Sequence, residues 1–133
     1  MTWNPPTNFS PVAGTIVAHF RSELPWSQLK VQGERPDIMP KRLVTVGEIG
    51  GPQSAGTALS DILVNAWADS AADAWQIASD TLTAARSLPG VDDIKAVSGP
   101  VGPREVDDDP AFVFGGIPLT HFYVTFTVLV KGH

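Results

Sequence analysis

The clearest pattern in the sequence is a strict alternation of apolar and other positions near its end. The apolar set consists of Phe122, Val124, Phe126, Val128 and Val130. Successive side chains of a strand point to opposite faces of a sheet, so the alternation predicts a strand over 122–131 with one buried apolar face. The threonines Thr45, Thr125 and Thr127 suit a wet or interfacial face of the same sheet.

Two segments carry apolar residues at helical spacing. The first, 11–23, begins at Ser10-Pro11, where Ser is a good N-cap and Pro suits the first helical position. The second follows Ser70, which together with Asp73 resembles a capping box, and it ends at Leu88-Pro89-Gly90. The predicted buried stripe of this second helix is Ala71, Ala74, Trp75, Ala78, Leu82 and Ala85.

Three further segments are predicted as strands. Residues 43–46 are rich in β-formers, 62–68 are largely apolar, and 94–101 form a weaker strand because glycine and proline disturb its far end. The stretch 26–41, with two prolines and no sustained period, is predicted as a loop. The order α-β-β-α-β-β then predicts an α+β fold, a four-stranded mixed sheet with two helices packed on one face. A right-handed crossover through the second helix makes the second and third strands parallel if they share the sheet.

Composition narrows the class of protein. The chain has 133 residues, 43% of them hydrophobic, and is interpreted as one domain over 1–133 with an extended arm at 1–9. Cysteine is absent, which excludes a disulfide framework and a cysteine nucleophile. The net charge of -5 disfavours a protein that wraps nucleic acid. No apolar run is long enough to span a membrane, and the first ten residues do not resemble a signal peptide, so we expect a soluble protein.

The three histidines are the natural starting point for a search for catalysis. His19 is expected to be a partly exposed helix residue, His121 has no acid partner at a recognisable spacing, and His133 is the last residue. The chain contains no HExxH, GxSxG or phosphate-loop motif. A pocket-containing enzyme or ligand-binding domain would use His19 or His121 with a carboxylate such as Asp61, and it is kept as a remote alternative. We predict no catalytic residue, no metal and no cofactor.

Trp67 and Trp75 are interpreted as a pair of core anchors, one on a strand and one on the helix facing it.

An acidic run and an apolar segment lie together in a long connection predicted over 102–119. Asp107, Asp108 and Asp109 lack the ligand spacing of an EF-hand, so they indicate a solvated loop or an acidic rim that repels or guides another charged surface.

The apolar segment is Pro110 to Pro118, which contains Phe112, Val113 and Phe114 between prolines and glycines. Hydrophobic connections of this kind often close on a partner surface. The alternative is that the two phenylalanines begin the final strand early and join the domain's own core.

Several short motifs follow one another along nearly the whole chain. They are the helix end Ser22-Glu23-Leu24-Pro25, the strand Arg42-Leu43-Val44-Thr45-Val46 running into Gly50-Gly51, the junction Trp67-Ala68-Asp69-Ser70, an Ala-rich helix, the turn Ser98-Gly99-Pro100, and the strand Tyr123-Val124-Thr125-Phe126-Thr127-Val128 ending in Lys131-Gly132. Their order and spacing resemble the tail terminator proteins of phages with long non-contractile tails, particularly phages of actinobacterial hosts. None of these motifs is a catalytic signature.

The resemblance implies a structural virion protein assembled in the host cytoplasm and located at the head-tail junction. Such subunits form a homo-oligomeric ring, usually a hexamer, that caps the head-proximal end of the tail tube. The ring stops addition of the major tail tube protein and presents a surface to the head-tail connector or neck (stopper) protein. Genome DNA passes through the lumen without specific binding, and Asp107, Asp108 and Asp109 are candidates for its acidic wall or rim. The candidate subunit or tube contacts are Phe112, Val113, Phe114, Gly50, Gly51 and Gln53.

Two further functions fit the same features. Another head-to-tail joining or tail-completion protein would share the size, acidity and mixed layout. A host-side adaptor or inhibitor would bind one protein partner through the Phe112 loop in a one-to-one complex without a ring.

Overall fold

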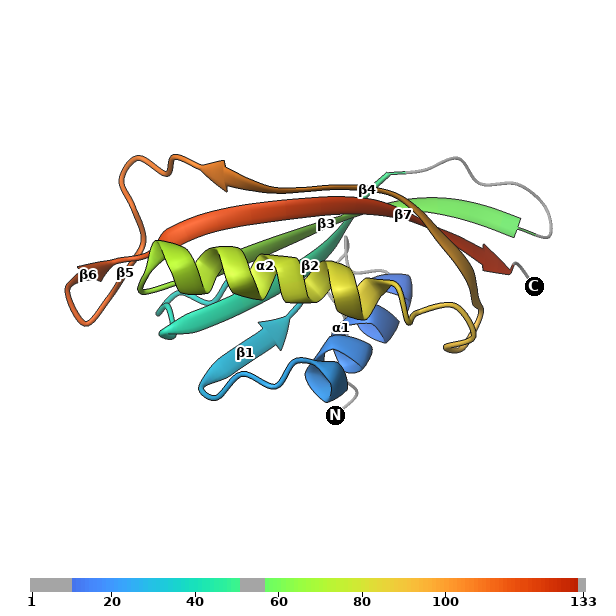
Figure 1. Ribbon diagram of the computed structural model, residues 1–133, viewed down its shortest axis with the longest axis horizontal. Coiled ribbons are helices and arrows are strands. Elements are labelled where there is room, and N and C mark those ends of the chain that lie inside the picture. Colours follow the sequence, from blue (N-terminus) through green and yellow to red (C-terminus); the bar gives the residue numbers. More distant parts are fainter. Residues whose placement is uncertain (1–10, 51–56, 132–133) are drawn as a thin grey trace.

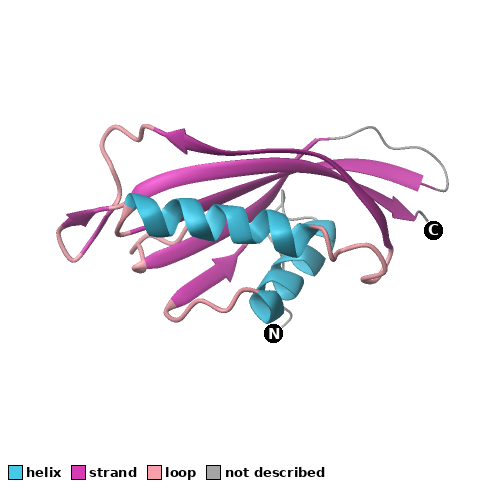
Figure 2. Ribbon diagram, viewed as in Figure 1, coloured by secondary structure: helices cyan, strands magenta, loops and turns pink. Residues whose placement is uncertain are grey.

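The protein has two layers, with helices on one face of a mixed sheet (Figure 1; Figure 2). The structure is a computed structural model and describes residues 11–50 and 57–131. Its elements are α1 (Pro11–Glu23), β1 (Leu29–Gln32), β2 (Arg42–Gly50), β3 (Thr57–Ala68), α2 (Ala71–Ala85), β4 (Ile94–Val106), β5 (Val113–Phe114), β6 (Ile117–Pro118) and β7 (Thr120–Lys131). The predicted α+β class with two helices on one face is confirmed. The predicted arm at 1–9 lies outside the described residues.

The main sheet has five strands in the order β1-β2-β3-β7-β4, and β5 and β6 form a separate two-stranded hairpin. The prediction of four strands in the order α-β-β-α-β-β is therefore wrong. β1 pairs parallel to β2, and the other neighbours are antiparallel. Because β3 and β4 both run antiparallel to β7, they are parallel to each other, as the crossover through α2 requires. β7 lies between them, so the two parallel strands are not neighbours.

The missed strand β1 lies inside the stretch 26–41 that was predicted as a loop. It is four residues long and stands at the edge of the sheet, where one neighbour suffices. Pro36 and Pro40, which suggested a loop, follow the strand and do not interrupt it. Short edge strands of this kind carry too few residues for a period to be recognised.

β4 is longer than the predicted strand 94–101 and extends into the predicted connection 102–119. The strand continues beyond the two Gly-Pro pairs, 99–100 and 102–103, because its pairing register with β7 shifts at each of them. The shifts lie between Ser98 and Val101 and between Val101 and Arg104. Proline is tolerated here because β4 is an edge strand, so one side of it needs no ladder hydrogen bonds. Gly102 has φ +111°, and a Cβ at this position would lie 2.7 Å from the carbonyl oxygen of Tyr123. Only glycine therefore allows the strand to approach β7 so closely.

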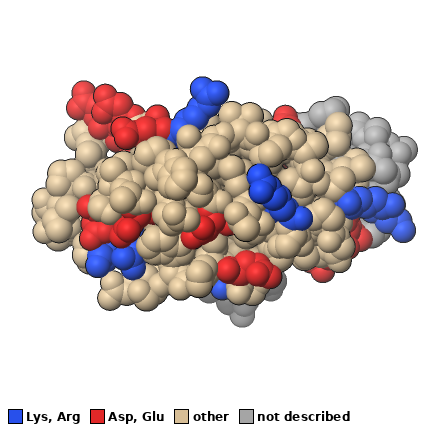
Figure 3. Space-filling model, viewed as in Figure 1, with Lys and Arg blue, Asp and Glu red and all other residues tan. Residues whose placement is uncertain are grey.

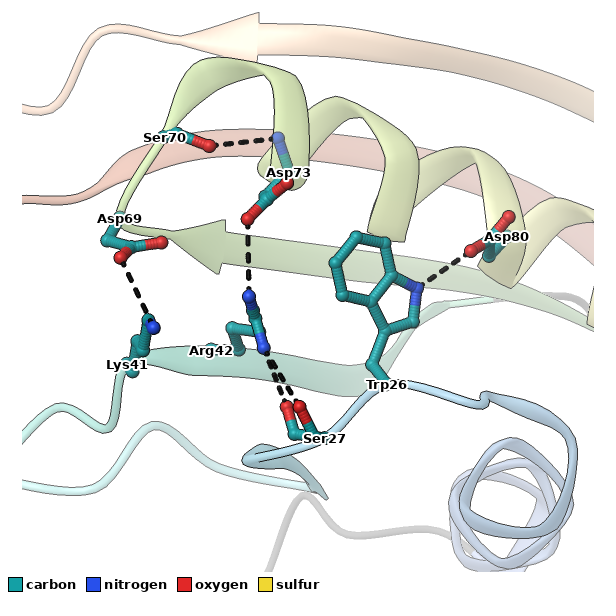
Figure 4. Close-up of polar contacts among 8 residues, drawn as sticks. All are labelled: Trp26, Ser27, Lys41, Arg42, Asp69, Ser70, Asp73 and Asp80. Atoms are coloured by element: carbon teal, nitrogen blue, oxygen red, sulfur yellow. Dashed lines mark hydrogen bonds and ion pairs between the residues drawn. The ribbon is translucent and has the colours of Figure 1, made fainter.

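Both predicted helices are present. α1 spans Pro11–Glu23, as the spacing predicts, and α2 begins after Ser70, whose Oγ accepts a hydrogen bond from the Asp73 backbone N–H at 3.2 Å. The capping box is only half formed, because the Asp73 carboxylate pairs with Arg42 at 3.3 Å instead (Figure 4). The helix thereby gains an ion pair to the start of β2.

The main core lies between the helices and the sheet. It includes Phe20 of α1, Ile77 of α2 and Phe126 of β7, and β7 presents its alternate residues to this face as predicted. The buried stripe of α2 is Ala74, Ile77, Ala78, Thr81, Ala84 and Ala85, so the predicted stripe is rotated. Trp75 stands two positions from Ile77, about 200° around the helix, and is 46% exposed. The prediction that Trp75 is a core anchor is therefore wrong.

A second, smaller core lies on the sheet face opposite the helices. It consists of Met39, Leu43, Trp67 and Leu119, with Phe112 partly buried against it. Trp67 is a core residue as predicted, but it packs on this second face and does not face α2. The end of the sheet where β1, β2 and β7 begin thus has side chains packed on both faces.

The segment between α1 and β2 is held against α2 by polar contacts (Figure 4). Trp26 Nε1 donates to the Asp80 carboxylate at 2.7 Å, and Arg42 Nη1 donates to the Ser27 carbonyl oxygen at 2.9 Å. Lys41 pairs with Asp69 at 3.7 Å, just before α2 begins. These contacts position β1 and the groove described below.

Candidate interaction site at one end of the sheet

A polar and aromatic cluster holds the connection between β4 and β5 against the open face of the sheet. His121 at the start of β7 is only 8% exposed and stacks on Trp67 of β3, with ring centroids 4.2 Å apart. The Nδ1 atom of His121 lies 3.0 Å from an Asp108 carboxylate oxygen, and Nε2 lies 2.7 Å from the Asn65 side chain. Trp67 Nε1 donates to the same Asp108 carboxylate at 3.3 Å. Asp108 thus joins the connection to two neighbouring strands.

The register of the sheet explains how these side chains meet. Trp67 and His121 are paired residues of β3 and β7, and Asn65 stands two positions along β3 on the same face. Val106 pairs with His121, so β4 ends beside the histidine and places Asp108 two residues beyond. The sequence prediction that His121 lacks an acid partner is wrong, because this pairing depends on strand order. A spacing of thirteen residues carries no recognisable signal of its own.

Burial lowers the pKa of His121 below its ordinary value, and the attraction and hydrogen bond of Asp108 oppose this shift. Because the net direction is downward, the neutral ring is the dominant form near pH 7. Nδ1 faces the Asp108 carboxylate and Nε2 faces Asn65 Oδ1. Both partners are acceptors, so a neutral ring donates a hydrogen bond to only one of them. An imidazolium would instead donate to both neighbours.

Neither His19 nor His121 contacts Asp61, the carboxylate given as an example for an enzyme, and the carboxylate beside His121 is that of Asp108. Asp61 accepts a hydrogen bond from Thr127 at 2.7 Å, and Thr127 stands six residues along β7 from His121. At about 3.4 Å per residue, Asp61 lies roughly 20 Å from that imidazole. His19 contacts the Ala84 carbonyl oxygen and the Ser87 hydroxyl, so it connects α1 to the end of α2. His121 has its partners, Asp108 and Asn65, on both ring nitrogens and is buried, which suits a positioning role.

The three aspartates of the acidic run have different surroundings. Asp108 is half-buried in the cluster, whereas Asp107 and Asp109 on either side are exposed. Within residues 11–50 and 57–131, no group of three His, Asp or Glu side chains is arranged to hold a metal ion. The exposed pair is available to another surface.

The apolar segment that follows forms the β5–β6 hairpin, which projects beyond the end of the sheet (Figure 1). Phe112 is half-buried, with its ring edge against Trp67 at a centroid distance of 6.2 Å and the Arg35 guanidinium 4.0 Å from its ring centroid. Val113 and Phe114 are 52% and 40% exposed, and Ile117 is also exposed. Phe112 therefore belongs to the base of the hairpin and Val113 and Phe114 to its free surface. Neither phenylalanine begins the final strand.

The other predicted contact residues lie at the far end of β2. Gly50 is the last residue of that strand. Gly51 and Gln53 lie outside the described residues.

An apolar groove of about 650 Å³ lies beside β1 and was missed by the sequence analysis. Its walls include Leu29 of β1, Ile38 and Met39 of the following loop and Phe114 of the hairpin, and its charged residues are Lys30 and Lys41. Alternation of apolar and polar residues over Leu29–Gln32 was the one available signal, but it is only four residues long. The groove itself depends on the hairpin, which is distant in sequence.

No protein-family model matches the chain, and no curated protein matches it. Among the described residues, neither helix has the length and apolar character needed to cross a membrane.

Proposed function

We propose that this chain is a tail terminator subunit of a phage with a long non-contractile tail. In this function, six copies form a ring on the head-proximal end of the tail tube. The ring covers the interface that the last tube ring would otherwise offer to another tube subunit, and its other side meets the neck. The protein makes and breaks no covalent bond.

The observation that carries the proposal is the β5–β6 hairpin. Val113, Phe114 and Ile117 are exposed apolar side chains on a single short hairpin, which is a costly arrangement for a free monomer and a usual one for a contact surface. The base of the hairpin is rigid, because Phe112 packs on Trp67 and the Leu119 N–H donates to the Phe112 carbonyl oxygen at 2.7 Å. A preorganised apolar element loses little conformational freedom on binding.

The charge distribution suits a ring that encloses DNA. Asp107 and Asp109 are exposed near the hairpin, and carboxylates on the wall or rim of a lumen would repel the phosphate backbone. Genome DNA would then pass without binding. This placement predicts that the aspartates line the channel side or its entrance.

The first test is the native mass by light scattering together with negative-stain images of any large species, with and without cognate tail tubes. A hexamer of 14.1 kDa chains would give roughly 85 kDa. Rings with a central hole, or labelled protein confined to one end of each tube, are expected. A protein that stays monomeric and binds neck protein but never tubes would contradict the terminator function and indicate another joining protein.

A matched pair of variants tests the hairpin. Phe114→Ala removes a 40% exposed ring from β5, and Trp75→Ala removes a 46% exposed ring from α2. We expect both to fold, with capping of tubes lost only in Phe114→Ala. Equal capping by both variants would contradict a contact role for the hairpin.

A further inference from the structure

We propose that residues 107–112, which lead from β4 to the β5–β6 hairpin, form a strap that opens and closes as one unit over the open face of the sheet. The structure shows the closed state, in which the strap holds the hairpin in place. In the open state the hairpin has no fixed orientation. The inference rests on the proposed function, because it states how the contact surface of that function is regulated.

The strap leaves the main sheet at the end of β4 and crosses two strands. Val106, the last residue of β4, pairs with His121 of β7. Asp108 then contacts His121, and Phe112 packs on Trp67 of β3, so the strap passes from β4 over β7 to β3. Figure 3 shows acidic atoms gathered at the surface over the end of β4, where the strap begins. The strap thus covers part of the face opposite the helices.

The strap is anchored at two residues that share one support. Asp108 and Phe112 are half-buried, whereas the other strap residues are exposed. Trp67 contacts both anchors: its Nε1–H donates to the Asp108 carboxylate at 3.3 Å, and its ring stands perpendicular to that of Phe112 at a centroid distance of 6.2 Å. His121 stacks on the same indole and also contacts Asp108. Because loss of either anchor frees this indole, we expect the two anchors to release together.

Opening of the strap leaves the main sheet intact. Among the described strands, β5 and β6 pair with each other and form their own two-stranded sheet, so the hairpin can move with the strap. The main core lies on the other face, under the helices. Opening therefore exposes only the second core, whose buried residues are Met39, Leu43, Trp67 and Leu119. A local opening that exposes so little apolar surface requires less free energy than unfolding of the whole domain.

The closed state defines the contact surface of the hairpin. Phe112 directly precedes Val113 and Phe114, which are 52% and 40% exposed. The Leu119 N–H donates to the Phe112 carbonyl oxygen at 2.7 Å, so both strands of the hairpin start from this anchor. A partner that binds the oriented hairpin therefore binds the closed state. Binding must also favour closing of the strap, because coupling between two equilibria is reciprocal.

Hydrogen exchange followed by NMR can test whether the strap is one unit. Two protons report on it: the Leu119 N–H, bonded to Phe112, and the Trp67 Nε1–H, bonded to Asp108. In the original chain we expect similar protection factors for both, lower than those of amides at the centre of β3 and β7. Protection of the two protons as high as that of the central strands would mean that the strap does not open locally, and would overturn the proposal.

Removal of one anchor should then release the other. Phe112→Ala leaves the Asp108 acceptor in place, and Asp108→Ala leaves the Phe112 carbonyl oxygen in place. We expect exchange to become about tenfold faster or more at Trp67 Nε1–H in the first variant and at Leu119 N–H in the second. Asp109→Ala removes an exposed carboxylate of the strap and is the matched control, with a change of less than about twofold at both protons. Unchanged exchange in both anchor variants would mean that the anchors act independently and would overturn the proposal.

An internal reference separates release of the strap from a general loss of stability. Trp26 Nε1–H donates to Asp80 of α2 at 2.7 Å, on the helix side of the sheet. This proton should keep its exchange rate in every variant. If it accelerates as much as the strap protons, the whole domain is destabilised and the strap is not a separate unit.

Tail tubes distinguish this inference from the proposed function. If binding favours the closed strap, exchange over 107–119 measured by mass spectrometry should become about threefold slower or more on capped tubes. Capped tubes without slower exchange would overturn the role of the strap in the contact and leave the terminator function intact. Reciprocal release of the anchors without capping of any tube would support the strap and contradict the terminator function.

Discussion

The two faces of the sheet are stabilised in different ways. The face under the helices is packed with aliphatic side chains and phenylalanines such as Phe20 and Phe126, from both helices and most strands. The opposite face carries a small cluster around Trp67 in which His121, Asp108 and Asn65 are joined by hydrogen bonds. Large apolar area holds the first face together, whereas directional contacts hold the second. The first face therefore determines whether the domain folds, and the second determines where the acidic segment and the hairpin stand.

The largest expected effect is on the helix-covered face. Phe20→Ala removes a fully buried ring and should lower the free energy of unfolding by about 3–5 kcal/mol, because it leaves a cavity between α1 and the sheet. Urea denaturation followed by circular dichroism measures it. A loss below about 1 kcal/mol would mean that this core is much less important than its burial indicates.

Phe112→Ser tests the base of the hairpin on the other face. We expect a loss of about 2 kcal/mol, since the ring is half-buried against Trp67 and under Arg35. Hydrogen exchange should show faster exchange in 107–119 and little change in α1. Phe114→Ser, one position beyond Val113 and exposed, is the control, and an equal loss in both variants would contradict the distinction between base and free surface.

The pH dependence of stability reports on His121. Its pKa is lowered in the folded protein, so the unfolded chain binds more protons as the pH falls through the ordinary histidine range. The stability that the neutral ring contributes is thus fully present above that range and is lost as the pH falls through the lowered pKa. The free energy of unfolding then changes by at most about 1.4 kcal/mol per pH unit. Denaturation between pH 7.5 and 5 should show a smaller loss in His121→Asn than in the original chain. Identical slopes would mean that the histidine titrates normally.

The smallest effect on stability is expected at the tip of the hairpin. Phe114→Ala should change the free energy of unfolding by less than about 0.5 kcal/mol, because the ring is largely in water, while abolishing capping. Thermal unfolding and the tube-end assay, carried out on one preparation, measure both. A large loss of stability would place this ring in the core.

Regular patterns were sufficient to predict the elements that contribute most to the main core. The bounds of α1 and the alternation of β7 follow from local spacing, because a helix or strand with one dry face must repeat its apolar residues at a set period. The same argument predicted the wrong stripe on α2. Its many alanines give several faces similar apolar character, and Ile77, not Trp75, is the large side chain that faces the sheet.

The contacts of the candidate site could not be predicted in this way. β1 is too short to show a period, and Asp108 reaches His121 only because β4 lies beside β7 and ends next to it. The segment Phe112–Phe114 was recognised as unusual from its composition. Which of its rings would be buried was left open, because burial depends on Trp67 from a distant strand.

By itself, the sequence determined the α+β class, both helices, the strand β7 and the presence of an apolar connection after an acidic run. Each of these follows from interactions between near neighbours along the chain. The tertiary structure decided the strand order, the second core around Trp67 and the pairing of Asp108 with His121. These features join residues that are far apart in sequence, and only packing of the whole domain brings such residues into contact.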